Sequence, residues 1–500
     1  MTDLWTFSTY GAALIALYLI GLGVYRLLFH PLAGIPGPLL GALTDYYVTY
    51  FEVLRNGDLV YQLQKLHAIY GPVVRMGPNS LHSSNPDVYS KVYTRGTSFV
   101  KDHALYRGFS QPMSSFGSVD PAFAKARRDV ISPLFSRRAI LKLEPFIREK
   151  VDKFTGKLLE YKDTSKPVDV FRAIRSMTFD IIYSYCFGEC YDALDAPNFS
   201  HPIIIDAELS SSYNLVFKAI PGLLPLQALV VKLLKPFGRS VPGRAQMRTK
   251  LLAQIDRLLR DPSALEDAPH ETVYHYLLRP HPEKGFPDIP PRSSLLDEAM
   301  NLQLAGSHTT ANASIVGCYH ILNNPKVHSR LVAELKEAIP DPQAISFEVV
   351  EKLPYLTAVI KESLRLSHGV VSPMLRVVNA DDTELDGIAV PRGTSVAIGN
   401  SFVHLNPDIF PDPYTFIPER WLGEDASTQE NYLVPFSRGQ RNCLGMNLAW
   451  CELYLIFSSM YRRVDLELSN SSPDDMIFRA HFIPVFPPRP VRAIVKGVAA

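Results

Sequence analysis

The chain has 500 residues, of which 47% are hydrophobic and 20% are charged, and its formal net charge is +1. This composition is typical of a globular protein with a large core, and the balanced charge argues against nucleic-acid binding through a basic surface. The five cysteines are an odd number, and their spacing fits neither a disulfide framework nor a zinc site, which favours a reducing compartment.

The first predicted element is an apolar helix at the N-terminus. No charged residue lies between Asp3 and Arg26, so Leu4–Tyr25 is an uncharged run of 22 residues. At about 1.5 Å per residue such a helix spans roughly 33 Å, enough to cross a bilayer. The acidic start and the basic residues after the run differ from a cleaved signal peptide and favour a cytosolic position for the rest of the chain. We expect residues 1–29 to be a membrane anchor; a buried core helix is the alternative.

The segment that follows, residues 30–38, contains three prolines and two glycines. It cannot continue a helix and is expected to form a stiff hinge. The rest of the chain, residues 30–500, is expected to be one catalytic domain, because its chemical motifs belong together in one site.

A long helix is predicted over residues 293–322, after Pro290-Pro291. It contains Ala305-Gly306-Ser307-His308-Thr309-Thr310. A glycine inside a helix costs about 1 kcal/mol relative to alanine, so Gly306 indicates a close approach or a local groove. Thr309 would present a hydroxyl there, and His308 can relay protons near neutral pH. A packing glycine beside a capping threonine is the competing interpretation.

A second helix is predicted from about Tyr355, and on it Glu362 and Arg365 are three residues apart and share one face. An isolated surface pair of this kind contributes little stability. Downstream, Leu385–Val390 and Ser395–Ile398 are predicted strands separated by a turn that ends at Gly393.

The most informative motif is Pro435-Phe436-Ser437-Arg438-Gly439-Gln440-Arg441-Asn442-Cys443-Leu444-Gly445, which matches F-x-x-G-x-R-x-C-x-G. It resembles the loop that presents a cysteine thiolate to haem iron in the cytochrome P-450 (haem-thiolate monooxygenase) family, with Phe436 at the first position. Cys443 would be the iron ligand, and Gly439 would allow a turn that aims amide groups at its sulfur. Arg441 suits a haem propionate, and Gly445 would leave room for the macrocycle. A buried structural cysteine is the competing reading.

The resemblance covers the chain from the anchor to the C-terminus and looks closest to filamentous-fungal members. It implies a mainly α fold with a minor β portion: one large helical haem-thiolate monooxygenase domain, with an N-terminal transmembrane helix and haem b as cofactor. The segment around Gly306 and Thr309 resembles the oxygen-activating signature, in which an acidic residue usually stands where this chain has His308.

Three arginines are assigned by the same resemblance. Arg128 and Arg376 match the positions of propionate partners, although Ala124 stands where a tryptophan is usual. Arg420 would join Glu362 and Arg365 in a triad beneath the cysteine loop. Burying these charges is tolerated only if all are paired, so the triad is expected to be structural.

The implied function is an NADPH- and O2-dependent monooxygenase that inserts one oxygen atom from O2 into a lipophilic small molecule. The fungal resemblance favours a terpenoid or polyketide intermediate of secondary metabolism. The chain has no flavin domain and no G-x-G-x-x-G unit, so electrons are expected from an NADPH–cytochrome reductase on the same endoplasmic reticulum membrane, docking near Arg137, Arg138 and Arg438. Substrate contacts are expected from Phe99–Phe116, from Leu302 and Ala305, and from Val370–Met374.

Two other classes stay open. The presence of His308 in place of the usual acid is compatible with a haem-thiolate isomerase or dehydratase that does not consume O2, whereas Thr309 argues against this class. A non-catalytic haem sensor or carrier is the third class. NADPH consumption stoichiometric with product would distinguish a monooxygenase from the isomerase or dehydratase. Turnover with a reductase would exclude the sensor or carrier.

Overall fold

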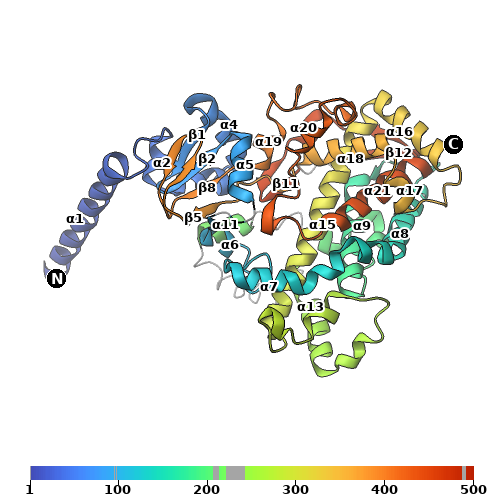
Figure 1. Ribbon diagram of the computed structural model, residues 1–500, viewed down its shortest axis with the longest axis horizontal. Coiled ribbons are helices and arrows are strands. Elements are labelled where there is room, and N and C mark those ends of the chain that lie inside the picture. Colours follow the sequence, from blue (N-terminus) through green and yellow to red (C-terminus); the bar gives the residue numbers. More distant parts are fainter. Residues whose placement is uncertain are drawn as a thin grey trace.

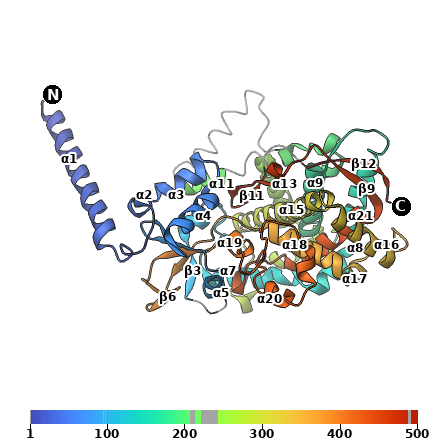
Figure 2. The same ribbon diagram turned by 90° about the horizontal axis from the view of Figure 1, so that it is seen from above.

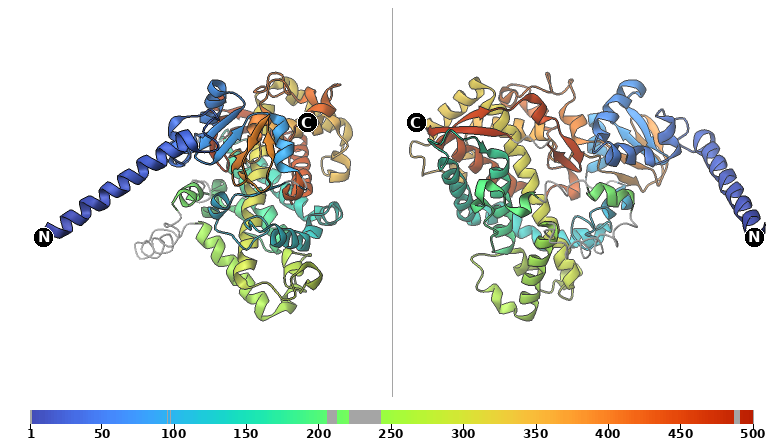
Figure 3. Two further views of the ribbon diagram at one scale, coloured as in Figure 1. Left: turned by 60° about the vertical axis from the view of Figure 1, so that its left-hand side comes forward. Right: turned by 180° about the vertical axis from the view of Figure 1, so that it is seen from behind.

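The computed structural model describes residues 2–94, 96, 98–205, 213–220, 243–486 and 491–499. It confirms the expected fold class, because helices dominate and strands form a minor portion. Figure 1 shows a small lobe rich in strands beside a larger helical lobe, with the N-terminal helix projecting from the small lobe. The two termini lie at opposite ends of the long axis (Figure 3).

The projecting helix is α1, Thr2–Val24, which continues as the π-helical turn η1, Tyr25–Phe29. Its segment Ser8–Phe29 has a mean hydropathy of 2.0, and none of it is buried in the protein. Figure 2 shows the helix standing clear of both lobes. The segment is thus long and apolar enough to cross a membrane by length and composition.

The base of this helix is tied to the small lobe by Arg75, a buried residue of the first strand. Its guanidinium donates to the backbone oxygens of Arg26, at 2.9 Å, and Pro78, at 2.8 Å. The Arg75 amide donates to Pro36 O at 2.8 Å, inside the proline-rich segment expected to be a hinge. These bonds fasten that segment to the sheet.

A five-stranded sheet with the order β1-β2-β8-β5-β3 organises the small lobe. Its strands β2 and β8 are parallel and the other neighbours are antiparallel. The strand β1 is buried along its whole length, which explains its apolar, β-branched start. In chain order the strands of this sheet are β1 Val73–Gly77, β2 Ser80–Ser83, β3 Phe99–Lys101, β5 Arg376–Val378 and β8 Ser395–Ala397.

The prediction of a single strand over Leu385–Val390 is wrong. The structure has a hairpin of β6, Thr383–Leu385, and β7, Ile388–Val390. Asp386 and Gly387 have φ values of 54° and 76°, and this Asp-Gly pair forms the tight turn that joins antiparallel strands. The prediction overlooked that turn signal, whereas the strand expected over residues 395–398 is confirmed to within one residue.

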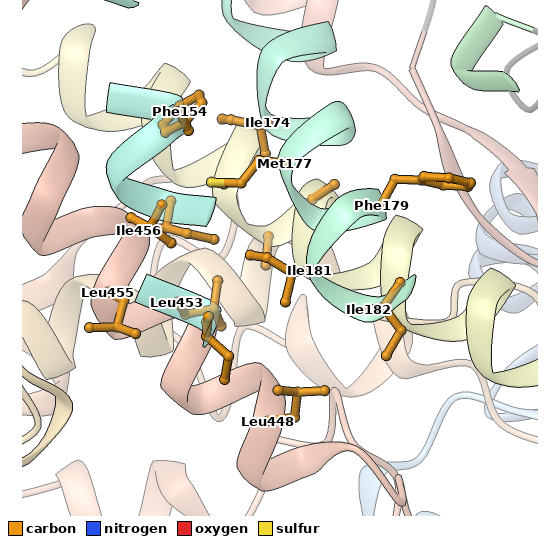
Figure 4. Packing of buried hydrophobic residues seen from close by; sticks show 14 of the residues in the cluster. Phe154, Ile174, Met177, Phe179, Ile181, Ile182, Leu448, Leu453, Leu455 and Ile456 are labelled. Atoms are coloured by element: carbon orange, nitrogen blue, oxygen red, sulfur yellow. The ribbon is translucent and has the colours of Figure 1, made fainter. Parts of the chain in front are cut away.

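The helical lobe is built around α15, Arg292–Leu322, which passes through its middle (Figures 1 and 2). Both α9, Val170–Phe187, and α18, Pro354–Ser367, pack against it. In Figure 4, Met177 and Ile181 of α9 lie in one apolar cluster with Leu453 and Ile456 of α21, Met446–Arg463. This core holds together the helices that carry the motifs.

The remaining elements complete the two lobes. The other α-helices are α2 Leu39–Leu43, α3 Tyr46–Thr49, α4 Leu59–Tyr70, α5 Pro86–Tyr93, α6 His103–Arg107, α7 Pro121–Ile131, α8 Arg137–Leu159, α11 Tyr213–Ala219, α13 Gly243–Arg260, α14 Val273–Leu277, α16 Pro325–Ala338, α17 Phe347–Val350, α19 Asn400–His404 and α20 Ala426–Glu430. The other strands are β4 Val168–Asp169, β9 Val464–Ser469 and β12 Arg492–Val498 in one sheet, and the hairpin β10 Arg479–His481 with β11 Ile483–Val485.

Candidate functional site

The cysteine motif forms a closed loop directly before α21. The Cys443 amide donates to Phe436 O at 2.7 Å and so joins the two ends of the loop. Gly439 has φ +73°, and a Cβ there would lie 2.4 Å from Tyr93 O. Only glycine combines this backbone angle with so close a neighbouring chain. The conformation of the loop therefore requires glycine at position 439.

Cys443 is exposed although it lies deep within the protein. An exposed side chain at such depth indicates an internal space rather than the outer surface. Burial raises the pKa of the Cys443 thiol, while the Gly445 amide, which donates to the sulfur, and Arg128 lower it. These two groups are what a thiolate ligand requires in its surroundings.

Gly445 stands immediately before α21. A Cβ at this position would meet no protein atom within 4 Å. The steric role expected for Gly445 can therefore concern only a bound cofactor. Within the protein, the Gly445 amide donates to the Cys443 sulfur.

On α15 the expected oxygen-side residues also border an open space. Ala305 is exposed and Thr309 is half-buried, although most of the helix around them is buried. The Thr309 hydroxyl donates to Ala305 O at 2.8 Å. The surroundings of Gly306 differ from those expected, because a Cβ at this residue would lie 2.5 Å from Cγ1 of Ile182 on α9. Its absent side chain serves the packing of two helices rather than a groove for dioxygen.

His308 is held in one tautomer by its neighbours. The Ser307 hydroxyl donates to Gln303 O at 2.9 Å, so the proton on His308 Nδ1 donates to Ser307 Oγ, at 3.0 Å, and to Leu304 O, at 3.3 Å. Burial and then the positive charge of Arg175 lower the pKa of His308 to about 3. The imidazole is therefore neutral at physiological pH, and it can relay a proton only by first accepting one.

The structure brings Glu362, Arg365 and Arg420 together as the resemblance implied. Glu362 Oε1 and Oε2 accept from Arg365 at 2.8 and 2.9 Å, and Oε1 accepts from Arg420 Nε at 3.1 Å. Glu362 and Arg365 are fully buried. Trp421 Nε1 adds a bond of 2.9 Å to Oε2, a partner that the sequence reading did not include. Every charge of this cluster is paired, as burial requires.

Arg128 and Arg127 point in different directions from α7. Arg128 donates to both the backbone oxygen, at 2.7 Å, and the side-chain oxygen, at 2.8 Å, of Asn442. Arg127 instead donates to Ser294 Oγ on α15 at 2.9 Å. Of the two, Arg128 is therefore the one that can act on the cysteine loop, directly beside Cys443.

Arg376 and Arg441 lie near a third basic group, Lys101, which the sequence did not single out. Burial, then the charges of Arg441 and Arg376, lower the pKa of Lys101 to about 6. The hydrogen bonds that these three groups donate go to backbone carbonyl groups and to the Tyr106 hydroxyl. Two guanidinium groups beside an amine whose charge they disfavour, all with neutral hydrogen-bond partners, favour an anionic ligand that would restore the charge of Lys101. Carboxylates such as haem propionates fit this cluster. The lysine in an otherwise apolar strand is the feature of the sequence that could have identified Lys101 as a member.

Aromatic side chains gather next to these cations. The ring of Phe109 lies 5.2 Å from that of Phe116 and 4.7 Å from that of Phe482. Phe109 and Phe116 belong to the loop expected to contact substrate, whereas Phe482 comes from the C-terminal hairpin. Phe482 O accepts from the Val371 amide at 2.9 Å, in the second expected substrate segment. The two segments are thus joined through Phe482, which sequence spacing does not reveal.

A family model described as Cytochrome P450 matches residues 36–495. The chain is 36% identical over 472 residues to cytochrome P450 monooxygenase macH of Penicillium terrestre, with 93% of this chain and 92% of that protein covered. It is 33% identical over 500 residues to N-acetyltryptophan 6-hydroxylase ivoC of Emericella nidulans, covering 96% and 94%. It is 34% identical over 464 residues to tryptophan 6-hydroxylase fscE of Fusarium equiseti, covering 90% and 89%.

Proposed function

The chain belongs to the cytochrome P450 family and is an oxidoreductase of the monooxygenase type, and from this premise we propose that it oxidises a lipophilic small molecule with haem b held by Cys443. The observation that carries the proposal is the exposed Cys443 thiol deep inside the protein, with the Gly445 amide on its sulfur. Cys443→Ser should abolish activity and the carbon-monoxide difference band typical of thiolate ligation. A variant that keeps that band would contradict the assignment.

The cofactor would be held by groups on two sides. Cys443 would supply the thiolate ligand, and Lys101, Arg376 and Arg441 would neutralise the propionates. Arg128 would act through Asn442 by fixing the residue that precedes the ligand. When bound, haem would supply the redox chemistry that uses O2 to oxidise a C–H bond. Lys101→Met should weaken haem retention, whereas the exposed Lys125, 66% accessible in its side chain, is a neutral control.

Thr309 would help deliver protons on the oxygen side of the site. Its hydroxyl is half-buried and lies beside the exposed Ala305. We expect Thr309→Ala to retain haem but to divert reducing equivalents into hydrogen peroxide. Thr309→Ser should recover the normal ratio of product to NADPH consumed. An unchanged ratio in the alanine variant would refute this role.

An NADPH–cytochrome reductase would dock on the surface near the cysteine loop. A hollow of about 270 Å³ lies there, lined among others by Arg137, Lys361, Asn447 and Trp450. Arg137 is already paired with Glu351 through two bonds of 2.6 and 2.9 Å, so Arg138, which is exposed, offers the more available charge. Electrostatic steering predicts that the rate of reduction falls with added salt. A flat response would argue against this surface.

Residues 1–29 would anchor the catalytic domain, residues 30–500, to the cytosolic face of the endoplasmic reticulum membrane. The exposed apolar segment Ser8–Phe29 supports this topology. Removing residues 1–29 should shift the protein from the membrane fraction toward the supernatant. Protease added outside intact microsomes should digest the catalytic domain. Full protection of that domain would reverse the proposed orientation.

The substrate would be a terpenoid or polyketide intermediate of fungal secondary metabolism. Hydroxylation of an aromatic ring is a second candidate, favoured by the cluster of Phe109, Phe116 and Phe482 and by the names of the two tryptophan-type hydroxylases among the relatives. Co-expression with a reductase and a panel of terpenoid, polyketide and indole precursors separates them. NADPH consumed in proportion to product excludes the isomerase or dehydratase alternative.

A further inference from the structure

A second hollow, the η2–α4 hollow, lies where the π-helical turn η2, Tyr50–Leu54, and the helix α4 meet the segment that begins β10. Its volume is about 260 Å³. The residues that form it come from the two ends of the chain, and neither the cysteine loop nor α15 contributes to its lining.

The walls of the η2–α4 hollow are held in place by contacts between these distant segments. The Ala480 amide donates to Gly57 O at 2.9 Å, and the Tyr61 hydroxyl donates to Phe478 O at 3.0 Å. The rings of Tyr61 and Phe478 lie 5.6 Å apart. The hollow is therefore part of the folded protein and does not need a ligand to form.

Basic side chains outnumber acidic ones in this hollow. Arg55, Lys65 and Arg479 line it, and Asp58 is the one carboxylate among the described residues of its lining. Asp58 is shared, because its Oδ2 lies 3.4 Å from Arg55 Nε and its Oδ1 accepts from Arg479 Nη1. Lys65 is exposed and forms no ion pair in the part of the chain that the structure describes. The surplus of positive charge favours an anionic ligand.

The same hollow has an apolar portion. Phe51 and Tyr61 line it together with Ile477, which is 51% exposed. Leu54, at the end of η2, is 76% exposed. Exposed apolar side chains grouped in this way mark an interaction site. A ligand that matches both kinds of surface is an anion that carries an apolar chain.

The exposed apolar surface continues from η2 to the base of the N-terminal helix. The turn η2 follows directly on α3, α3 contacts α2, and α2 contacts η1. Leu39 and Leu40 on α2 are 63% and 62% exposed, and Tyr46 on α3 is 73% exposed. Figure 2 shows α2 and α3 near the base of α1. The surface that reaches both the anchor and the hollow is that of a lipid bilayer.

We propose that the η2–α4 hollow binds the phosphate group of an anionic membrane phospholipid. Arg55 and Arg479 bond the phosphate oxygens through their planar guanidinium groups, and Lys65 adds a point charge. The acyl chains lie along Phe51 and the exposed side of η2. Lipid bound in this hollow fixes the orientation of the catalytic domain on the membrane. The inference rests on the proposed membrane anchoring and is independent of the reaction that the enzyme catalyses.

The test counts the lipid molecules that the full-length holoenzyme retains in native mass spectrometry. The protein, purified in a nonionic detergent, is titrated with dioctanoyl phosphatidic acid and should retain a single molecule. Dioctanoylglycerol has the same chains without the phosphate and should bind about 100-fold more weakly, because each basic group contributes about fivefold. Inorganic phosphate, which has no chains, should also bind more weakly. Binding of either probe as tight as that of phosphatidic acid would overturn the proposal.

Charge substitutions distinguish this hollow from a general attraction to anions. Lys65→Glu replaces attraction by repulsion at an exposed position and should weaken phosphatidic acid binding about 25-fold. Lys326→Glu makes the same change of charge on the exposed surface of α16 and should have no effect. Asp58→Asn removes the carboxylate of the hollow and should tighten binding about fivefold. Equal effects of the two lysine substitutions, or weaker binding after Asp58→Asn, would refute the site.

These measurements need neither NADPH nor a substrate. A negative result in them would leave the proposed oxidation untouched. A full-length protein that remains in the supernatant when cells are fractionated would instead contradict the anchoring, and with it this inference.

Discussion

Glu362→Gln is the substitution for which the structure gives the sharpest expectation. The Glu362 carboxylate accepts five hydrogen bonds: Oε1 accepts from Arg365 Nη2, Arg420 Nε and the Ile417 amide, and Oε2 accepts from Arg365 Nε and Trp421 Nε1. Glutamine has the same shape, but one of its two positions becomes an NH2 group. Whichever oxygen is replaced, at least two donors then face a donor.

The substitution also leaves two buried guanidinium groups without their counter-charge. Glu362 and Arg365 side chains are fully buried and that of Arg420 is 5% exposed. Removing one partner of a buried ion pair costs about 3–5 kcal/mol. Because domains are stable by only about 5–15 kcal/mol, this loss is a large part of the total. Arg365 also donates to the backbone oxygens of His404 and Pro413, so the segment leading to the cysteine loop should loosen with it.

The assay is urea unfolding of the holoenzyme at one cofactor concentration, because bound cofactor itself shifts the midpoint. The midpoint of Glu362→Gln should fall with an unchanged slope, and the carbonyl band typical of thiolate ligation should disappear before helical content does. Asp129→Asn is the control, since it breaks an exposed pair with Lys125 and should cost at most about 1 kcal/mol. Equal midpoints for the two variants would refute the reasoning.

Three further outcomes are expected. Gly439→Ala should lose thiolate ligation, because residue 439 has φ +73° and its Cβ would lie 2.4 Å from a backbone oxygen. Gly393 has φ +88° but open space around it, so Gly393→Ala should lower the free energy of unfolding by only about 1–2 kcal/mol. Gly306→Ala should destabilise the fold by about 1–3 kcal/mol in urea unfolding, and shortening Ile182 to alanine in the same chain should recover part of that loss. His404 Nε2 accepts from a backbone amide at 2.9 Å, and burial holds the pKa of His404 well below its usual value. The unfolded chain therefore binds one more proton at this histidine. The contribution of His404 to stability should be retained above about pH 6.5 and fall below it by up to about 1.4 kcal/mol per pH unit; a decline of the same total slope in His404→Gln would contradict this.

The sequence by itself determined the features that depend on neighbouring residues. The cysteine loop is a contiguous motif whose glycine has the backbone angle that the spacing required. The apolar N-terminal helix and the long helix around Thr309 follow from composition and periodicity, and the structure has both. Such features are local, so the chain carries their whole cause in one stretch.

Tertiary structure alone decided the features that depend on what packs nearby. Lys101 meets Arg376 and Arg441 only after the sheet forms, and Gly306 faces Ile182 because α9 crosses α15. The neutral state of His308 follows from burial and from the positive charge of Arg175 beside it, since the free energy of an ionised group depends on its surroundings more than on its position in the chain.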